Sequence, residues 1–269
     1  MKEESPFAAL LKRWDRHIDL SEDDRRAVLA LPYTRRALAR DAYLVREGQH
    51  TDQCILLVAG SAYRQKLVET GGRQIISVHI PGELIDAQQA LLAEADHNVQ
   101  SLGPSEVAFI PKPALINVMA ERPQVGRAVW FDTLIDASIF REWVVNVGRR
   151  NARTRIAHLL CELSLRFRGA GLSRGDLIRF PLTQEQIADA TGLTPVHTNR
   201  TLQALRQERL IELRAMHLRV LDWQRLVEVG DFSERYLHQN DRIAEAGWPG
   251  AGPGGASPQP QPHHAAARY

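Results

Sequence analysis

A run of hydrogen-bonding side chains that follows a proline is the part of this sequence best suited to chemistry. Thr194 is a good N-cap, and Pro195 fits the first helical position, where a missing N–H costs nothing. The first turns of the helix then hold four hydrogen-bonding residues, His197, Thr198, Asn199 and Arg200. A helix that enters a DNA groove end-on presents these early residues to base edges. The pattern predicts a helix that reads base pairs.

A second helix is expected directly before this one. Thr183 can cap it, and Gln186 can bond back to the cap amide in a capping box. Gly192 can end it, because a residue without a Cβ adopts the left-handed conformation at little cost. Two capped helices around a glycine predict a helix-turn-helix, although an ordinary helical hairpin would carry the same caps.

Charge distribution favours the DNA-binding interpretation. The net charge is only +2, but residues 144–222 hold 13 arginines against 7 acidic residues, while residues 1–140 hold 16 cations against 19 acids. The second helix carries Arg200, Arg206 and Arg209, and no carboxylate precedes Glu208. The positive excess coincides with the helix pair, as contacts with DNA phosphates require.

A helical start is expected at residues 1–30, where Ser21 can cap a second stretch of helix. Short strands separated by glycine turns then dominate the first half of the chain. The expected strands are residues 43–45, 54–58, 61–64, 74–80 and 107–110. Their length and spacing predict a jelly-roll-like β roll or barrel.

A long helix is expected from Pro123 to Gly148, with apolar residues on more than one side. Such a helix needs two partners, which could be the roll and the same helix of a second subunit; a helix buried wholly within one domain is the alternative. No regular heptad is assigned, because Asp132, Asp136 and Glu142 interrupt the heptad patterns of apolar residues that we considered.

The fold class is therefore predicted as α+β. A helix at 152–167, a strand at 177–181 and a hairpin at 210–221 surround the helix pair and complete a winged helix-turn-helix. The expected domains are 1–122 (helices and β-roll sensor), 123–148 (dimerisation helix), 149–238 (winged helix-turn-helix) and 247–269 (disordered tail).

This order of elements resembles the Crp/Fnr superfamily of bacterial transcription regulators. The resemblance covers about residues 20–237 and rests on short motifs of the roll together with the more specific helix pair at 182–200. The roll motifs are Glu47-Gly48, Leu57-Val58-Ala59-Gly60, Gly72-Arg73-Gln74-Ile75 and Pro81-Gly82-Glu83-Leu84. The resemblance implies a homodimer that binds double-stranded DNA at near-palindromic sites and contacts RNA polymerase. A cytoplasmic location is expected by default, because no apolar run reaches the length that spans a bilayer.

The resemblance also assigns roles within the helix pair. Thr183 and Thr194 match positions used on phosphates, and Arg200 matches the arginine that reads guanine. Where the best-known members carry a glutamate that accepts from cytosine, this chain has Val196, which offers only an apolar contact. His197 and Asn199 remain as polar candidates, so the preferred half-site should differ from theirs.

The effector is not assigned by the sequence. Cyclic-nucleotide-binding members use an arginine after the Gly-Glu-Leu turn, but no arginine lies between Arg73 and Arg122, so cAMP and cGMP are not expected. The oxygen-sensing branch needs four cysteines, whereas only Cys54 and Cys161 are present. Haem ligation by His79 and oxidation of Cys161 are the remaining sensor hypotheses, each set against simple burial. No cofactor is predicted.

Other classes of function were weighed on the same residues. A cupin-like metalloenzyme needs two histidines one residue apart, and His50, His79 and His97 lack that spacing, so neither a metal nor a catalytic residue is predicted. A ligand-binding adaptor without DNA affinity is a third possibility. No apolar run is long enough to cross a bilayer, so no membrane association is expected.

Overall fold

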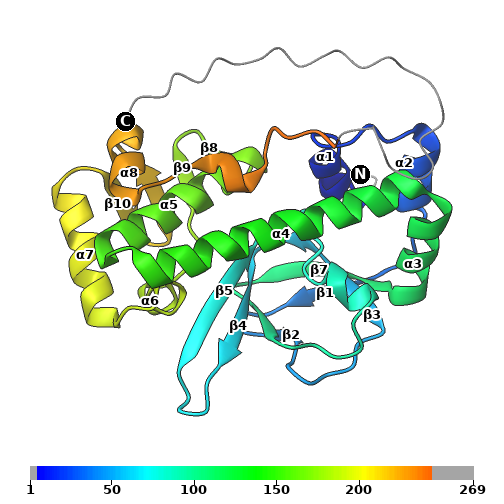
Figure 1. Ribbon diagram of the computed structural model, residues 1–269, viewed down its shortest axis with the longest axis horizontal. Helices are drawn as coiled ribbons and strands as arrows, with labels where there is room; N and C mark the ends of the chain where they lie inside the picture. Colours follow the sequence, from blue (N-terminus) through cyan, green and yellow to red (C-terminus); the bar gives the residue numbers. More distant parts are fainter. Residues whose placement is uncertain (1–4, 244–269) are drawn as a thin grey trace, which may run out of the picture.

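The computed structural model describes residues 5–243, and it confirms a mixed α+β fold. The predicted tail at 247–269 lies outside the described residues. Figure 1 shows one long helix crossing the molecule, with the β strands against one side of it and the helix-turn-helix near one end.

Two antiparallel sheets form the β roll. One sheet has the order β1-β7-β3, from Thr34–Leu38, Ser105–Pro111 and Gln53–Ala59. The other has the order β2-β6-β4-β5, from Tyr43–Val45, Asn98–Ser101, Ala62–Leu67 and Arg73–His79. All five predicted strands are present, and β1 and β6 are additional. Strand β6 was missed because its polar residues are buried and hydrogen-bonded, which no alternation of apolar residues signals.

The helical start is broken into two short helices, α1 (Ala8–Trp14) and α2 (Glu22–Leu29). Ser21 begins α2 with a capping box to Asp24, because its hydroxyl accepts from the Asp24 amide and the Asp24 carboxylate accepts in return. Further along, a 3-10 turn η1 (Ala87–Ala90) and helix α3 (Lys112–Glu121) lead to the long helix. The helical start expected from the sequence is thus present as two short segments, and the second begins at the predicted Ser21 cap.

The long helix α4 extends from Pro123 to Arg149 and presents one face to the protein and one to solvent. Its inner face buries Ile135, Ile139 and Trp143. The side facing solvent carries a line of residues that we call the outer stripe: Trp130, Thr133, Ala137, Phe140, Val144 and Val147. Three of them, Trp130, Phe140 and Val144, are about half exposed, at 51%, 46% and 53%. Within one chain, the wholly buried helix is thus excluded.

The outer stripe of α4 follows the 3-4 spacing of a heptad, contrary to our reading of the sequence. The interrupting carboxylates lie off this register and have partners elsewhere. Asp132 accepts from Arg13 Nε at 2.8 Å and from Trp14 Nε1 at 2.7 Å, and Asp136 accepts from Arg64 Nη1 at 2.7 Å. The sequence does not reveal this heptad register, because it does not show which carboxylates form ion pairs inside the protein.

The C-terminal half is a winged helix-turn-helix with a four-stranded sheet. Its elements are α5 (Ala152–Gly169), β8 (Ser173–Arg174), β9 (Leu177–Arg179), α6 (Gln184–Thr191), α7 (Pro195–Gln207), β10 (Ile211–Arg214), β11 (His217–Val220), α8 (Trp223–Gly230) and the 3-10 turn η2 (Glu234–Leu237). The strand order is β10-β11-β9-β8. One buried apolar cluster joins this half to the roll, from Ile75 on β5 through Trp143 on α4 to Leu202 on α7.

A buried ionic network fixes the two halves against each other. Arg166 on α5 donates from Nη2 to the Glu83 carboxylate at 3.1 Å and to the Val78 carbonyl at 2.6 Å, both in the roll. Its Nη1 donates to Glu162 on α5, also at 3.1 Å. Arg13 on α1 reaches the same Glu83 oxygen at 3.4 Å. Although burial opposes ionisation, Arg166, His79 and Arg13 hold the pKa of Glu83 well below its usual value.

We expect Glu83→Ala to lower the free energy of unfolding by about 3–5 kcal/mol, because it removes the only carboxylate of the roll that pairs with the buried Arg166 among residues 5–243. Glu94→Ala, at an exposed position, should cost less than about 1 kcal/mol. Urea denaturation followed by circular dichroism measures both. Equal losses in the two variants would contradict the role given to Glu83.

The buried ring of His158 leads us to expect that the protein loses stability on mild acidification. Burial of the ring and the nearby Arg150 lower its pKa below 6.5, while Glu162, Glu142 and the Gly230 carbonyl oppose this only in part. The unfolded chain therefore takes up a proton near pH 6.5 that the native protein resists, and the unfolded state gains stability as the pH falls. The stability that the neutral His158 ring contributes is fully present above pH 6.5 and is lost as the pH falls towards its lower pKa in the native state.

We expect the free energy of unfolding to fall between pH 7 and pH 5.5, by up to about 1.4 kcal/mol per pH unit for this histidine. His158→Gln should flatten the decline, although its stability at pH 7 is lower. The control is His50→Gln, which changes an exposed ring. An unaltered slope in His158→Gln would contradict the assignment.

Candidate nucleic-acid interface

The first helix of the pair, α6, begins and ends as the sequence predicts. The Thr183 hydroxyl accepts from the Gln186 amide at 3.2 Å, and the Gln186 side chain accepts from the Thr183 amide at 2.9 Å. Gly192 follows the helix in the left-handed conformation, with φ of +63°. These local contacts set where α6 stops and where the next helix can start.

The second helix, α7, presents a continuous exposed face. Thr194 caps it by accepting from the His197 amide at 3.3 Å. Val196, Arg200, Gln203 and Gln207 are all exposed, and their spacing of four, three and four residues places them on one side. Val196 is the most exposed large apolar residue of the range 5–243, with 80% of its surface accessible. This exposed face, Val196-Arg200-Gln203-Gln207, is called the reading face below.

Two predicted contact residues lie beside the reading face. His197 and Asn199 are half-buried, and Asn199 Nδ2 donates to Gln184 Oε1 at 2.8 Å. Thr198, which the sequence placed among the base-facing residues, points into the core and is fully buried. The sequence missed Gln203 and Gln184, although helical spacing from Arg200 would have found the first.

The wing is the hairpin of β10 and β11. Its two-residue turn, Ala215-Met216, has positive φ values of 46° and 62°, which match the twist of a tight hairpin. Arg214 and His217 flank the turn, and both are exposed. These side chains add a second polar surface to the helix pair.

The helix pair is also held by the roll. Arg73, at the start of β5, donates from Nε to the Asp189 carboxylate on α6 at 2.7 Å, and its Nη2 lies 2.6 Å from the same oxygen. Glu185 on α6 lies 3.9 Å from this guanidinium. The β4–β5 hairpin therefore contacts the helix that supports the reading face.

The sensor hypotheses fall on buried side chains. His79 is 3% exposed, and its Nδ1 lies 3.3 Å from Glu83 Oε2, so the ring is packed within the network described above. Cys54 and Cys161 are fully buried, and burial raises their thiol pKa to about 11 and about 12. A thiol that resists ionisation is a poor redox sensor.

Carboxylates lie in the stretch after the Gly-Glu-Leu turn, where the resemblance implies an arginine in members that bind cyclic nucleotides. His97 lies between Asp96 Oδ1, at 2.6 Å, and Asp86 Oδ1, at 3.0 Å. The nearest buried cation, Arg64 on β4, has Nη1 on Asp136 at 2.7 Å and Nη2 3.6 Å from Asp86. A phosphodiester entering here would meet three acids and one arginine that is already paired.

Two further features of the described residues bear on the candidate classes. Residues 5–243 contain no group of three or more histidine, cysteine, aspartate or glutamate side chains placed to hold a metal ion. None of the helices in the same range is long and apolar enough to cross a membrane.

Both halves of the chain match known protein families. Residues 154–229 match the Crp-like helix-turn-helix domain, and residues 35–122 match the cyclic nucleotide-binding domain. The transcriptional activator protein FnrL of Cereibacter sphaeroides is 30% identical over 198 residues, which span 71% of this chain and 78% of that protein. The transcriptional activator protein Anr of Pseudomonas protegens is 24% identical, over 76% of this chain and 84% of that protein.

Solved structures share the fold. FixK2 from Bradyrhizobium japonicum superimposes with a TM-score of 0.68 at 22% identity, over 74% of this chain and 98% of that one. A CooA mutant from Carboxydothermus hydrogenoformans superimposes with a TM-score of 0.62 at 14% identity, over 86% of this chain and 97% of that one.

Proposed function

We propose, from the premise that this chain belongs to the Crp/Fnr family of transcription regulators, that it binds near-palindromic DNA as a homodimer. The reading face is the observation that carries this proposal. It combines a long cation, two amides and an exposed valine on one side of α7. Arginine can pair with guanine, glutamine with adenine, and valine can contact a thymine methyl group.

The residues predicted from the sequence divide between two roles in this proposal. Val196 and Arg200, joined by Gln203, would meet base edges, whereas Thr183 and Thr194 stand at helix N-termini, where phosphates bind. Asn199 would contact DNA only if its hydrogen bond to Gln184 broke, and His197 lies at the edge of the reading face. Arg214 and His217 on the wing would add contacts to the backbone.

The outer stripe of α4 supports the homodimer. Two such helices packed side by side would bury Trp130, Phe140 and Val144 of each chain and remove a large apolar surface from water. A two-fold axis along the stripe would also place two reading faces on one side of the dimer, as successive major grooves require.

The carboxylates around His97 and the pairing of Arg64 support a regulator that does not respond to cyclic nucleotides. The proposal keeps the domain division at 1–122, 123–148 and 149–238, in which the roll acts as a regulatory domain. Contact with RNA polymerase and the absence of a catalytic activity follow from the proposed role.

We expect Arg200→Ala to reduce specific DNA affinity by about 1–3 kcal/mol per half-site, because the bidentate contact with guanine is lost. The measurement is fluorescence anisotropy on duplexes that the wild-type protein selects from a random pool. Arg235→Ala, at an exposed position outside the helix pair, is the control. Undiminished binding by Arg200→Ala would show that α7 does not read DNA.

We expect Phe140→Asp to convert the dimer to a monomer, because it places a charge at the centre of the outer stripe. Val145→Asp is a matched control, since Val145 has a similar exposure, 44%, but lies off the stripe. Analytical ultracentrifugation distinguishes the two species. If Phe140→Asp remains dimeric, or if both variants dissociate, the stripe is not the dimer interface.

A further inference from the structure

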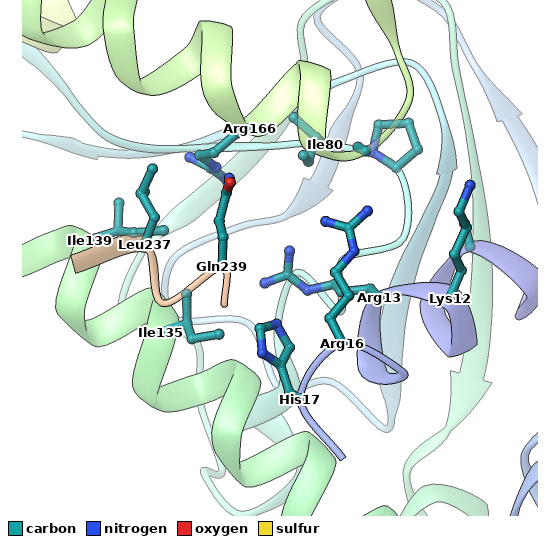
Figure 2. Close-up of a pocket in the computed structure, with 13 residues that line it drawn as sticks. Lys12, Arg13, Arg16, His17, Ile80, Ile135, Ile139, Arg166, Leu237 and Gln239 are labelled. Atoms are coloured by element: carbon teal, nitrogen blue, oxygen red, sulfur yellow. The ribbon is translucent and has the colours of Figure 1, made fainter. Parts of the chain in front are cut away.

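A basic cavity of about 80 Å³ lies where the N-terminal helix, the long helix and the DNA-binding half meet (Figure 2). Its walls come from α1 and the turn after it, from the loop after β5, from α4 and α5, and from the segment 237–239. The charged lining consists of Lys12, Arg13, Arg16, His17 and Arg166, and it includes no aspartate or glutamate. Neither the DNA-reading surface nor the interior of the roll contains this cavity.

Only part of this positive charge is neutralised by the protein. Arg13 and Arg166 are paired with carboxylates that lie behind the lining, Glu83 and Asp132 for the first and Glu83 and Glu162 for the second. Arg16 instead donates to the backbone carbonyl of Gly169. Within residues 5–243, Lys12 has no ion-pair partner. Two positive charges beside the cavity, those of Lys12 and Arg16, thus have no carboxylate partner within residues 5–243.

The remaining walls are apolar. Ile80, Ile135, Ile139 and Leu237 contribute them, and Figure 2 shows Ile135, Ile139 and Leu237 on the side opposite Lys12. Apolar walls strengthen the attraction between the cations and an anion, because they exclude water. The volume is well below the roughly 300–1,000 Å³ of pockets that take drug-sized ligands, so a nucleotide is too large.

We propose that this cavity binds a small oxyanion, namely the carboxylate or phosphate group of a metabolite with few heavy atoms. Arg16 and Lys12 supply the uncompensated charge, Arg166 and Arg13 line the inner end, and a short aliphatic portion of the ligand faces the isoleucines. The bound anion contacts the roll loop, α1 and α5 together and tightens their packing. The inference is independent of DNA reading, because binding is measured on the protein alone.

His17 gives the proposal a specific spectroscopic readout. Its Nδ1 lies 2.8 Å from the Asp241 carbonyl, which can only accept, so Nδ1 carries the proton and Nε2 is left for the cavity. Burial lowers the pKa of this ring, and the cations Arg13 and Arg16 lower it further, while Asp132 on α4 acts in the opposite direction. An anion beside the ring favours its charged form, so binding raises the pKa of His17.

The full-length protein is titrated with inorganic phosphate and, separately, with butyrate, with chloride replaced to keep the ionic strength constant. We expect at least one of these anions to raise Tm by about 2–4 °C in a saturable way. The pKa of His17, followed by NMR, should rise with the same midpoint. Saturation by phosphate alone identifies a phosphate group as the ligand, and saturation by butyrate alone identifies a carboxylate.

Two variants test the location. Arg16→Gln and Lys12→Gln should each weaken anion binding about tenfold or more, because each removes a charge-assisted hydrogen bond. Lys12 is exposed, so its variant tests the site even if Arg16→Gln fails to fold. Arg46→Gln, which removes an exposed cation of the roll, should bind as the wild type does. The absence of saturable stabilisation by both anions, or full binding in Lys12→Gln, overturns the proposal.

Discussion

The ion pair between Glu83 and Arg166 is the constraint on which the arrangement of the two halves depends. Both side chains are almost fully buried, at 7% and 6% exposure, and they come from the roll and from the helix that leads into the DNA-binding half. Each charge alone would be costly in that environment, so neither half can leave the other without exposing or stranding an ion. The same glutamate also holds Arg13, which bonds to Asp132 on α4, and through these contacts the N-terminal helix joins the assembly.

Around this pair the packing is continuous rather than divided at a linker. The apolar cluster passes from β5 through α4 to α7, and the segment after α8 returns to the N-terminal helix, where the Ile243 amide donates to the His17 carbonyl at 2.8 Å (Figure 1). Arg73 adds a polar contact between the β4–β5 hairpin and α6. A change at Arg73 would therefore act on α6 directly, and a change at Glu83 would act on α5, which packs against the helix pair.

The parts of the fold that the sequence predicted are those set by local chemistry. Caps at Thr183 and Thr194 and the left-handed Gly192 depend on neighbours within a few residues, so the helix pair could be predicted. The heptad of α4 could not, because Asp132 and Asp136 look like interruptions until Arg13 and Arg64 are seen to pair with them from distant elements. Strand β6 was missed for a related reason: Gln100 is buried there because it accepts from Tyr63 and Gln65 across the sheet. At the candidate site, Thr198 is buried and Arg200 is exposed. The sequence could not distinguish these two residues, because it gives residue types but not burial.

The glutamate of the Gly-Glu-Leu turn is engaged in ion pairs within the protein. In this chain Glu83 lies between Arg166, Arg13 and His79, and its carboxylate is committed to holding the two halves together. Arg64, the buried arginine of the roll interior, is similarly committed to Asp136 and Asp86. To bind an anionic ligand in the roll, the protein would have to break one of these buried pairs and leave a carboxylate without its cation, at a cost of several kcal/mol. Lys12 and Arg16, which have no carboxylate partner within residues 5–243, instead line the cavity at the junction of the two halves. The internal charge balance therefore disfavours an anion in the roll interior, and the cavity at the junction of the two halves is the anion site that we propose.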